Sequence, residues 1–416
     1  MRQGDTRKDI LPKIMTFRPK NIFFYLQTNQ WIIIGLLFLL SLLLSLQNIS
    51  LGVKNFGGGQ NTHYNNYVLF KNSFFHLVEN KNLYSYYCNE YADLYKYSPT
   101  FASIMAVFYY LPDSIGLIVW NSLNIFVLYY ALYSIKSIDP SRKIIIILYL
   151  LFELILSTQN SQCNSMLAGL TITAFNMLEK GKNTQATLFI VLGTFIKIYS
   201  IVGCVLLLLY PNKLKSILSL SVWLVLFFLL PLLVVDFSEL IWQYKNWYTL
   251  LGADQNESIG MSFFSFTQFA FPLNYFKLIT LAFGTIIIFT PLLKFKLFAC
   301  QQFRLQYMAL ILIWMVVFNY KAESPTYVIA MAGIGVWLFT SKKSKINSIL
   351  AILTLLFTSI WFTDIIPNSI KNNFIDLKFI KSFFPILILI KLYFDLIFKN
   401  IDNKEGDTNL YVAHSV

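Results

Sequence analysis

The side chains best suited to chemistry lie together in one polar, aromatic stretch, residues 64–101. It holds three carboxylates and flanking lysines among many tyrosines: Glu79, Glu90, Asp93, Lys71, Lys81 and Lys96. A carboxylate beside cations can act as a general base, or it can be half of a surface ion pair. Asp93 is the strongest candidate base, because it stands in "DLYKYSP", just before the proline that begins the next apolar segment.

The elements that carry this stretch are those of a membrane protein. The chain has 416 residues, of which 56% are hydrophobic, 17% aromatic and only 13% charged, far below the charged share of a soluble domain. Apolar runs of about 20 residues, enough to cross a hydrocarbon core, recur from Trp31 almost to the C-terminus. The sequence therefore predicts an all-α, polytopic transmembrane helix bundle.

The net charge of +13 does not indicate nucleic-acid binding. The basic residues stand in short clusters between apolar runs, as in "SRK" at 141, "PNKLK" at 211, "KFK" at 294 and "SKKSK" at 341, which is typical of positive-inside topology signals. The four cysteines form no CxxC pair and no histidine stands at metal-ligand spacing. We expect no cofactor and no metal held by the protein alone.

The hydropathy pattern predicts about 12 spans with both termini inside. The candidates are 31–49, 98–112, 115–135, 143–158, 163–178, 186–210, 216–235, 275–292, 304–319, 326–340, 346–363 and 379–397. They divide the chain into a basic cytoplasmic N-terminus (1–30), a transmembrane domain (31–397) with a large first outer loop (50–97), and a polar cytoplasmic tail (398–416).

The segments 98–135 and 186–210 leave the count open. The first interpretation takes all 12 candidates as spans. Under the first interpretation, the loops at 136–143 and 179–185 face outward despite their lysines, against the positive-inside rule. In the second, 98–135 makes a single crossing and 186–210 splits into two half-helices. Both put residues 50–97, 236–270, 320–325 and 364–378 on the outer face. These segments are rich in aromatic and polar residues, which favours a functional site there.

Ionisable residues inside apolar runs are the second signal, because a charge at bilayer depth is costly and usually faces a cavity. Lys197 in "GTFIKIYS" is the clearest case; it either serves a site, snorkels or pairs with Glu153. The segment "STQNSQCN" (157–164) contributes Gln159 and Asn160. Lys321 and Glu323 in "NYKAESPT" are site residues or a simple loop pair.

Lysines near tyrosines at a membrane surface suit a lipid phosphate, because the ammonium neutralises the anion and the phenol donates a hydrogen bond. Lys71, Tyr84 and Lys96 fit this description in the first loop. The sequence contains no Walker loop and no dinucleotide fingerprint, so a soluble nucleotide is a poor candidate donor.

The order of several motifs resembles that of a known family. They are "NYVLFKNSFFHLVENKNLY" (66–84), "YKYSP" (95–99), "LPDSIGLIVWNSLN" (111–124), "QNSQCNSMLAGLTITAFNMLEKGK" (159–182) and "FIKIYSIVGCVLLLLYPNK" (195–213). Over residues 31–340 the chain resembles integral-membrane glycosyltransferases of the GT-C class, specifically glycosyltransferase family 87. Where the family pattern has the presumed aspartate base, this chain has Asn66, an amide that cannot accept the proton in the same way.

The resemblance implies a metal-independent, mannosyltransferase-like hexosyltransferase. It would move a hexose or pentose from a polyprenyl-phosphate-sugar donor to a glycan or glycolipid acceptor, at the outer face of the plasma (inner) membrane, in the cell envelope. Asp93 is then the expected base, with Glu323 and Glu90 as alternatives and Asn66 as a hydrogen-bonding residue. The expected substrate-binding residues are Lys71, Tyr84, Lys96, Gln159, Asn160, Lys197 and Lys321. The competing class is a non-catalytic or transport protein of the same fold, such as a flippase or exporter, and the missing aspartate favours it.

Overall fold

The structure is a computed structural model. It describes residues 29–56, 59–254, 259–270, 276–363, 365–367, 369 and 379–398. The N-terminal segment and the polar tail, for which the sequence predicts a cytoplasmic location, lie outside the described residues apart from 29–30 and 398, as does most of the outer segment 364–378.

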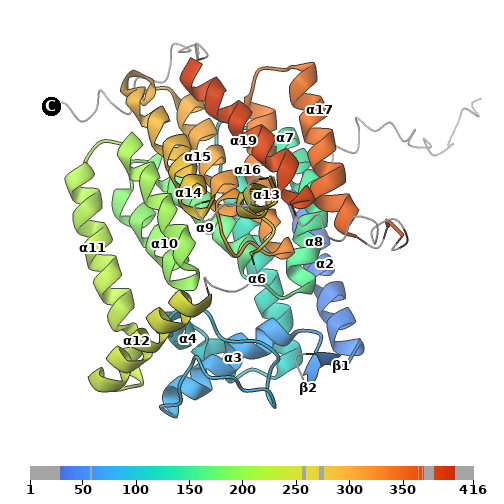
Figure 1. Cartoon of the computed structure of the whole chain (residues 1–416), viewed down its shortest axis with the longest axis vertical. Helices are drawn as coiled ribbons and strands as arrows, with labels where there is room; N and C mark the ends of the chain where they lie inside the picture. The colour runs from blue at the N-terminus through green and yellow to red at the C-terminus, as the bar shows by residue number, and fades with distance from the viewer. Residues whose placement is uncertain are drawn as a thin grey trace, which may run out of the picture.

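Helices make up most of the described chain, as predicted (Figure 1). Five stretches are long and apolar enough, by length and composition, to cross a membrane. They are α2 (Gln30–Ser50), α6 (Asp113–Tyr133), α11 (Lys213–Leu229) with the 3-10 turn η2 (Leu230–Leu233), α14 (Phe276–Phe289) with η3 (Thr290–Leu293), and α17 (Lys345–Thr354) with η6 (Leu355–Ser359) and η7 (Ile360–Phe362). The prediction of an all-α polytopic bundle is confirmed.

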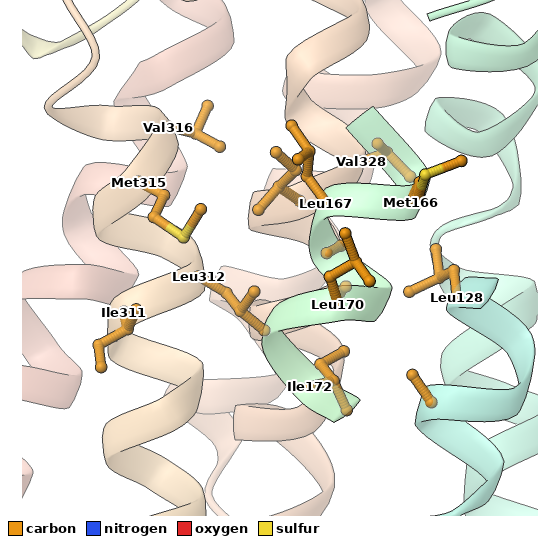
Figure 2. Close-up of a cluster of buried hydrophobic side chains, with 14 of the residues drawn as sticks. Leu128, Met166, Leu167, Leu170, Ile172, Ile311, Leu312, Met315, Val316 and Val328 are labelled. Atoms are coloured by element: carbon orange, nitrogen blue, oxygen red, sulfur yellow. The ribbon is translucent and has the colours of Figure 1, made fainter. Parts of the chain in front are cut away.

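The remaining bundle helices are not among these five stretches. They are α7 (Pro140–Tyr149), α8 (Leu151–Gln159), α9 (Asn164–Leu178), α10 (Asn183–Ile196), η1 (Ile198–Leu209), η4 (Phe295–Leu297), α15 (Gln301–Val317), η5 (Ser324–Thr326), α16 (Tyr327–Thr340) and α19 (Ile380–Phe398). Helices α9, α15 and α16 are buried on nearly every face, and Figure 2 shows their aliphatic side chains facing one another. At the opposite extreme, Ser216 is the one buried residue of α11, whose leucines face outward as expected against lipid.

A layer of small elements, which we call the polar layer, covers one end of the bundle, the lower end in Figure 1. It contains the hairpin β1 (Val53–Phe56) and β2 (Gly59–Thr62), which pair antiparallel, and the helices α3 (Asn65–Val78), α4 (Pro99–Ile104), α5 (Ala106–Tyr109) and α12 (Phe237–Asp254). The short helix α13 (Phe263–Ala270) is not part of this layer; it packs against α14 and α19. Most of this layer comes from the segments 50–97 and 236–270, for which the sequence predicts one common side.

The segment 98–135 makes one crossing, as the second interpretation has it. Ser98 caps the N-terminus of α4 through its side chain and Pro99 occupies the first turn, but α4 and α5 together span only residues 99–109. At about 1.5 Å per residue, their 10 helical residues reach roughly half of a hydrocarbon core. Only α6 is long enough to cross in this segment.

The segment 186–210 also follows the second interpretation. Helix α10 ends at Ile196, Lys197 is extended (φ −139°, ψ 121°), and η1 runs back beside α10. The start of α10 and the end of η1, both far from Lys197, meet where Asn183 Nδ2 donates to the Pro211 carbonyl at 3.2 Å. The segment is therefore a helical hairpin with Lys197 at its tip.

The loops 134–137, 179–180 and 301 line one small pocket, so they share one end of the bundle. This end is opposite to α3, because the α3 residue Lys71 contacts Asp113 at the start of α6 and residue 134 follows the end of that helix, about 30 Å away. The first interpretation, which put 136–143 and 179–185 on the side of residues 50–97, is wrong. The basic clusters "SRK" and "PNKLK" gather at the end opposite the polar layer.

One of the alternatives for Lys197, a pair with Glu153, is excluded. Glu153 does not pair with Lys197; it forms a fully buried ion pair with Lys381 of α19, with Nζ and Oε1 2.7 Å apart. A second buried pair, Arg304 with Glu179, joins α15 to the end of α9 at 2.6 Å. Both pairs connect helices far apart in the sequence.

Candidate functional site

A cavity of about 320 Å³ lies between the polar layer and the bundle. It is lined by parts of α3, the loop before α4, the turn before α9, the hairpin tip, the last turn of α12 and the loop before η5. Six of the ten predicted site residues line it: Asn66, Asp93, Lys96, Lys197, Lys321 and Glu323. The fold thus brings together residues up to 257 positions apart (323 minus 66).

Lys197 enters the cavity from the hairpin tip. Its backbone N–H donates to the Gly193 carbonyl at 2.8 Å and its carbonyl accepts from Ser200 N–H at 2.9 Å, which fixes the turn between α10 and η1. Its Nζ donates to Gln162 Oε1 at 3.2 Å and to Asn164 Oδ1 at 2.9 Å. These are neutral acceptors, so they orient the ammonium without cancelling its charge.

Lys197 has no carboxylate within ion-pair distance among the described residues, whereas Lys96 and Lys321 both have one. Its Nζ also lies 5.6 Å from the ring centroid of Tyr97, on whose face a cation is favoured. A half-buried, unneutralised ammonium held by amide oxygens is suited to bind an incoming anion.

Asp93 lies beside Asn66, although 27 residues separate them. Asn65 Oδ1 accepts a hydrogen bond from Ala92 N–H at 2.9 Å, which ties the start of α3 to the loop that carries Asp93. Asp93 is exposed to the cavity and its Oδ1 accepts from Leu94 N–H at 2.7 Å. Asn66 Nδ2 donates to the Asn160 carbonyl at 2.8 Å. A carboxylate is thus present next to the position at which the resemblance leads us to expect one.

Asp254 is a cavity residue that the sequence did not single out. Its Oδ1 lies 3.1 Å from Lys96 Nζ and 3.5 Å from Lys321 Nζ, and its side chain is only 12% exposed. Burial lowers the pKa of Lys96, but Asp93, Asp254 and Glu323 raise it, and the net shift is upward. Lys96 therefore stays charged, and Asp254 is held between two cations.

Glu323 does not form the simple loop pair with Lys321 that the sequence left open, because Lys321 contacts Asp254 instead. Glu323 Oε2 accepts from Gln162 Nε2 at 3.4 Å, and the same amide accepts from Lys197 through its oxygen. Gln162 was not predicted individually, but it lies in "STQNSQCN", the polar segment that the sequence analysis selected.

The other four predicted residues do not line the cavity. Lys71 pairs with Asp113 at 2.6 Å, Tyr84 is buried with its hydroxyl donating to the Tyr97 carbonyl, and Gln159 donates to Gln47. Asn160 is exposed and borders the site through its carbonyl, which accepts from Asn66.

The alternative base Glu90 is used elsewhere. Its Oε2 lies 3.0 Å from Nε2 of the buried His76 and accepts from Asn72 at 3.1 Å. His76 in turn stacks on Tyr87, with ring centroids 3.9 Å apart. These contacts pack α3 against the loop that follows it, and Glu90 does not line the cavity.

The described residues contain no group of three or more His, Cys, Asp or Glu side chains placed to hold a metal ion. The cavity instead combines three lysines with three carboxylates, Asp93, Asp254 and Glu323. Such a site can bind an anion at the lysines while a separate carboxylate accepts a proton.

A polytopic helix bundle with a charged cavity at one end is the class of protein that this fold and site define. The model of glycosyltransferase family 87 matches residues 95–359, more than half of the chain, and the chain belongs to this family. It is a membrane glycosyltransferase. A comparison with curated proteins finds no match. The matched region includes Lys96, Lys197, Lys321 and Glu323, while Asn66 and Asp93 precede it.

Proposed function

We propose that this glycosyltransferase uses a polyprenyl-phosphate-linked hexose or pentose and transfers the sugar to a glycan or glycolipid at the outer face of the plasma membrane. The observation that carries the donor assignment is Lys197, an ammonium without a carboxylate partner in the described chain, in a cavity beside lipid-facing helices. A membrane-bound phosphate ester has the charge opposite to that of Lys197 and fits the position of Lys197 beside the lipid.

The side of the membrane is argued from charge. The basic clusters lie at the bundle end opposite the cavity, and positively charged loops remain preferentially in the cytoplasm. The cavity then opens at the outer face of the membrane, and a lipid-linked sugar on that side can reach it without crossing the bilayer.

The chemistry follows from the two kinds of charge. Asp93 takes the proton of the acceptor hydroxyl as the hydroxyl oxygen forms the new bond to the anomeric carbon. The bond from that carbon to the lipid-phosphate oxygen breaks, and the electron pair leaves with the phosphate. Lys197 stabilises the negative charge that develops there. Asp93 is favoured over Asp254, which is held between two lysines, and over Glu323, because it lies beside Asn66.

The test is donor consumption by the purified protein. Radiolabelled polyprenyl-phosphate-mannose, -glucose and -arabinose are supplied with a membrane glycolipid extract, and loss of donor is measured. We expect one donor to be consumed and Asp93→Asn to lower turnover by about 10²- to 10⁴-fold with nearly constant donor affinity. Asn66→Ala is expected to be milder.

The same assay assigns the base. Near-normal turnover in Asp93→Asn with complete loss in Glu323→Gln would move the base to the later loop. Consumption of none of the three donors would overturn the proposed donor class and favour the transport alternative on the same fold.

A further inference from the structure

The contact of Asp254 with Lys96 and Lys321 has no part in the mechanism above. One carboxylate oxygen serves two lysines from separate loops, at 3.1 and 3.5 Å, and it does so on the wall of the cavity. The three cavity lysines therefore differ: Lys197 has no carboxylate partner in the described chain, and the other two share one.

We propose that Lys96 and Lys321 form a second anion subsite, and that Asp254 is an internal anion which a phosphate group of a substrate displaces. The inference rests on the proposed function, because it adds a subsite to the same cavity. It identifies the ligand chemistry as the phosphate of an anionic lipid acceptor, because the single phosphate of the donor is already assigned to Lys197.

Geometry supports displacement. A carboxylate and a phosphate both present oxygen anions to ammonium groups at similar distances, so one can replace the other. Asp254 belongs to the last turn of α12. The contacts that anchor this helix lie one or more turns earlier, so they do not hold Asp254 in place. Trp247 Nε1 donates to the Lys96 carbonyl at 3.1 Å, and Gln243 contacts the backbone of Lys81 and Leu83 at 2.7 and 3.2 Å.

The charge balance points the same way. The cavity carries three lysines and three carboxylates, so an added phosphate leaves it with a net negative charge unless a carboxylate moves away. Asp254 is the least exposed of the three acids, and its departure would release two lysines at once. Asp254 pairs with both cations, which avoids two uncompensated charges in a half-buried site.

The experiment measures binding of inorganic phosphate to the full-length protein by calorimetry, in a Lys197→Met background that removes the first anion site. Adding Asp254→Asn is expected to tighten phosphate binding about tenfold, because the internal competitor is lost while its size is kept. Adding Lys321→Gln as well should abolish the gain. The matched control is Asp395→Asn, which removes a carboxylate 2.9 Å from Lys391 on α19, away from the cavity, and should change nothing.

Unchanged or weaker phosphate binding in the Asp254→Asn variant would overturn the proposal and show that the contact of Asp254 with the two lysines only stabilises the fold. If Asp254→Asn does not fold, Lys321→Gln alone decides: phosphate binding equal to that of the Lys197→Met parent overturns the subsite, and weaker binding supports it. Two further ligands separate the sources of phosphate. A gain for phosphatidylinositol in nanodiscs supports a subsite for an acceptor phosphate, and a gain only for farnesyl phosphate would overturn this assignment by placing the donor phosphate there.

These outcomes are independent of the sugar-transfer assay. Failure of all three donors with an intact phosphate gain would reject the proposed donor class and still support the subsite. Donor turnover without a phosphate gain would do the reverse.

Discussion

Replacement of Lys197 by methionine tests the site most directly, because it removes one charge from the cavity and keeps most of the side-chain volume. In the structure Lys197 Nζ has two neutral hydrogen-bond acceptors and, within the described chain, no ion pair. We expect Lys197→Met to weaken donor binding much more than it weakens the fold.

The magnitude follows from the contacts. A hydrogen bond between an ammonium and a phosphate contributes about 1.5–3 kcal/mol, which corresponds to a donor Kd raised roughly 10- to 100-fold. The cost to folding is small, because Gln162 Oε1 still accepts from Tyr97 at 3.3 Å and Asn164 Oδ1 from Tyr199 at 3.4 Å. Losing the desolvated cation offsets part of the lost hydrogen bonds, so the free energy of unfolding should fall by about 1 kcal/mol or less.

The assay is binding of a radiolabelled polyprenyl-phosphate sugar in nanodiscs, with thermal unfolding measured on the same samples. Lys391→Met is the control, because Lys391 is a partly buried lysine of α19 whose partner is Asp395, outside the cavity. Its donor affinity should equal that of the wild type. An unchanged donor affinity in Lys197→Met together with a large loss of thermal stability would refute the reasoning and make Lys197 a structural residue.

Three further outcomes are expected. If Asp93 replaces the family aspartate, Asn66→Asp should restore part of the turnover lost in Asp93→Asn in the donor-consumption assay, and no restoration would show that the two positions are not equivalent. In a Cys88→Ser background, which removes the exposed cysteine of the same loop, a cysteine at position 93 should react with an impermeant thiol reagent added outside intact cells, and one at Lys342 only after permeabilisation; the reverse pattern would contradict the topology. Glu179→Gln should lower stability by about 3–5 kcal/mol, because it removes the carboxylate that pairs with a buried arginine, whereas Glu79→Gln should leave the melting temperature unchanged. Equal melting temperatures for these last two variants would mean that the buried pair does not hold α9 to α15.

Composition and hydropathy were enough to predict the fold class. A lipid bilayer accepts helices whose backbone groups are satisfied internally, so apolar runs of the right length predict a helix bundle whatever its packing. The same rule explains why Lys197 could be singled out: a charge inside an apolar run is costly, and its position alone signals a cavity or a partner. The sequence also identified the polar layer that covers the cavity.

The pairing of charges was decided only in three dimensions. Sequence gives the cost of burying Glu153 but not its partner, and the partner is Lys381, 228 residues away. Asp254 had no signal of its own, because an acid at the end of an amphipathic helix is usually solvated; its meaning depends on two lysines delivered by other loops. Likewise, hydropathy could not say whether 186–210 is one helix or two, because a straight span and a hairpin bury the same apolar residues. Only the packing of η1 back along α10 places Lys197 at a turn that faces the cavity.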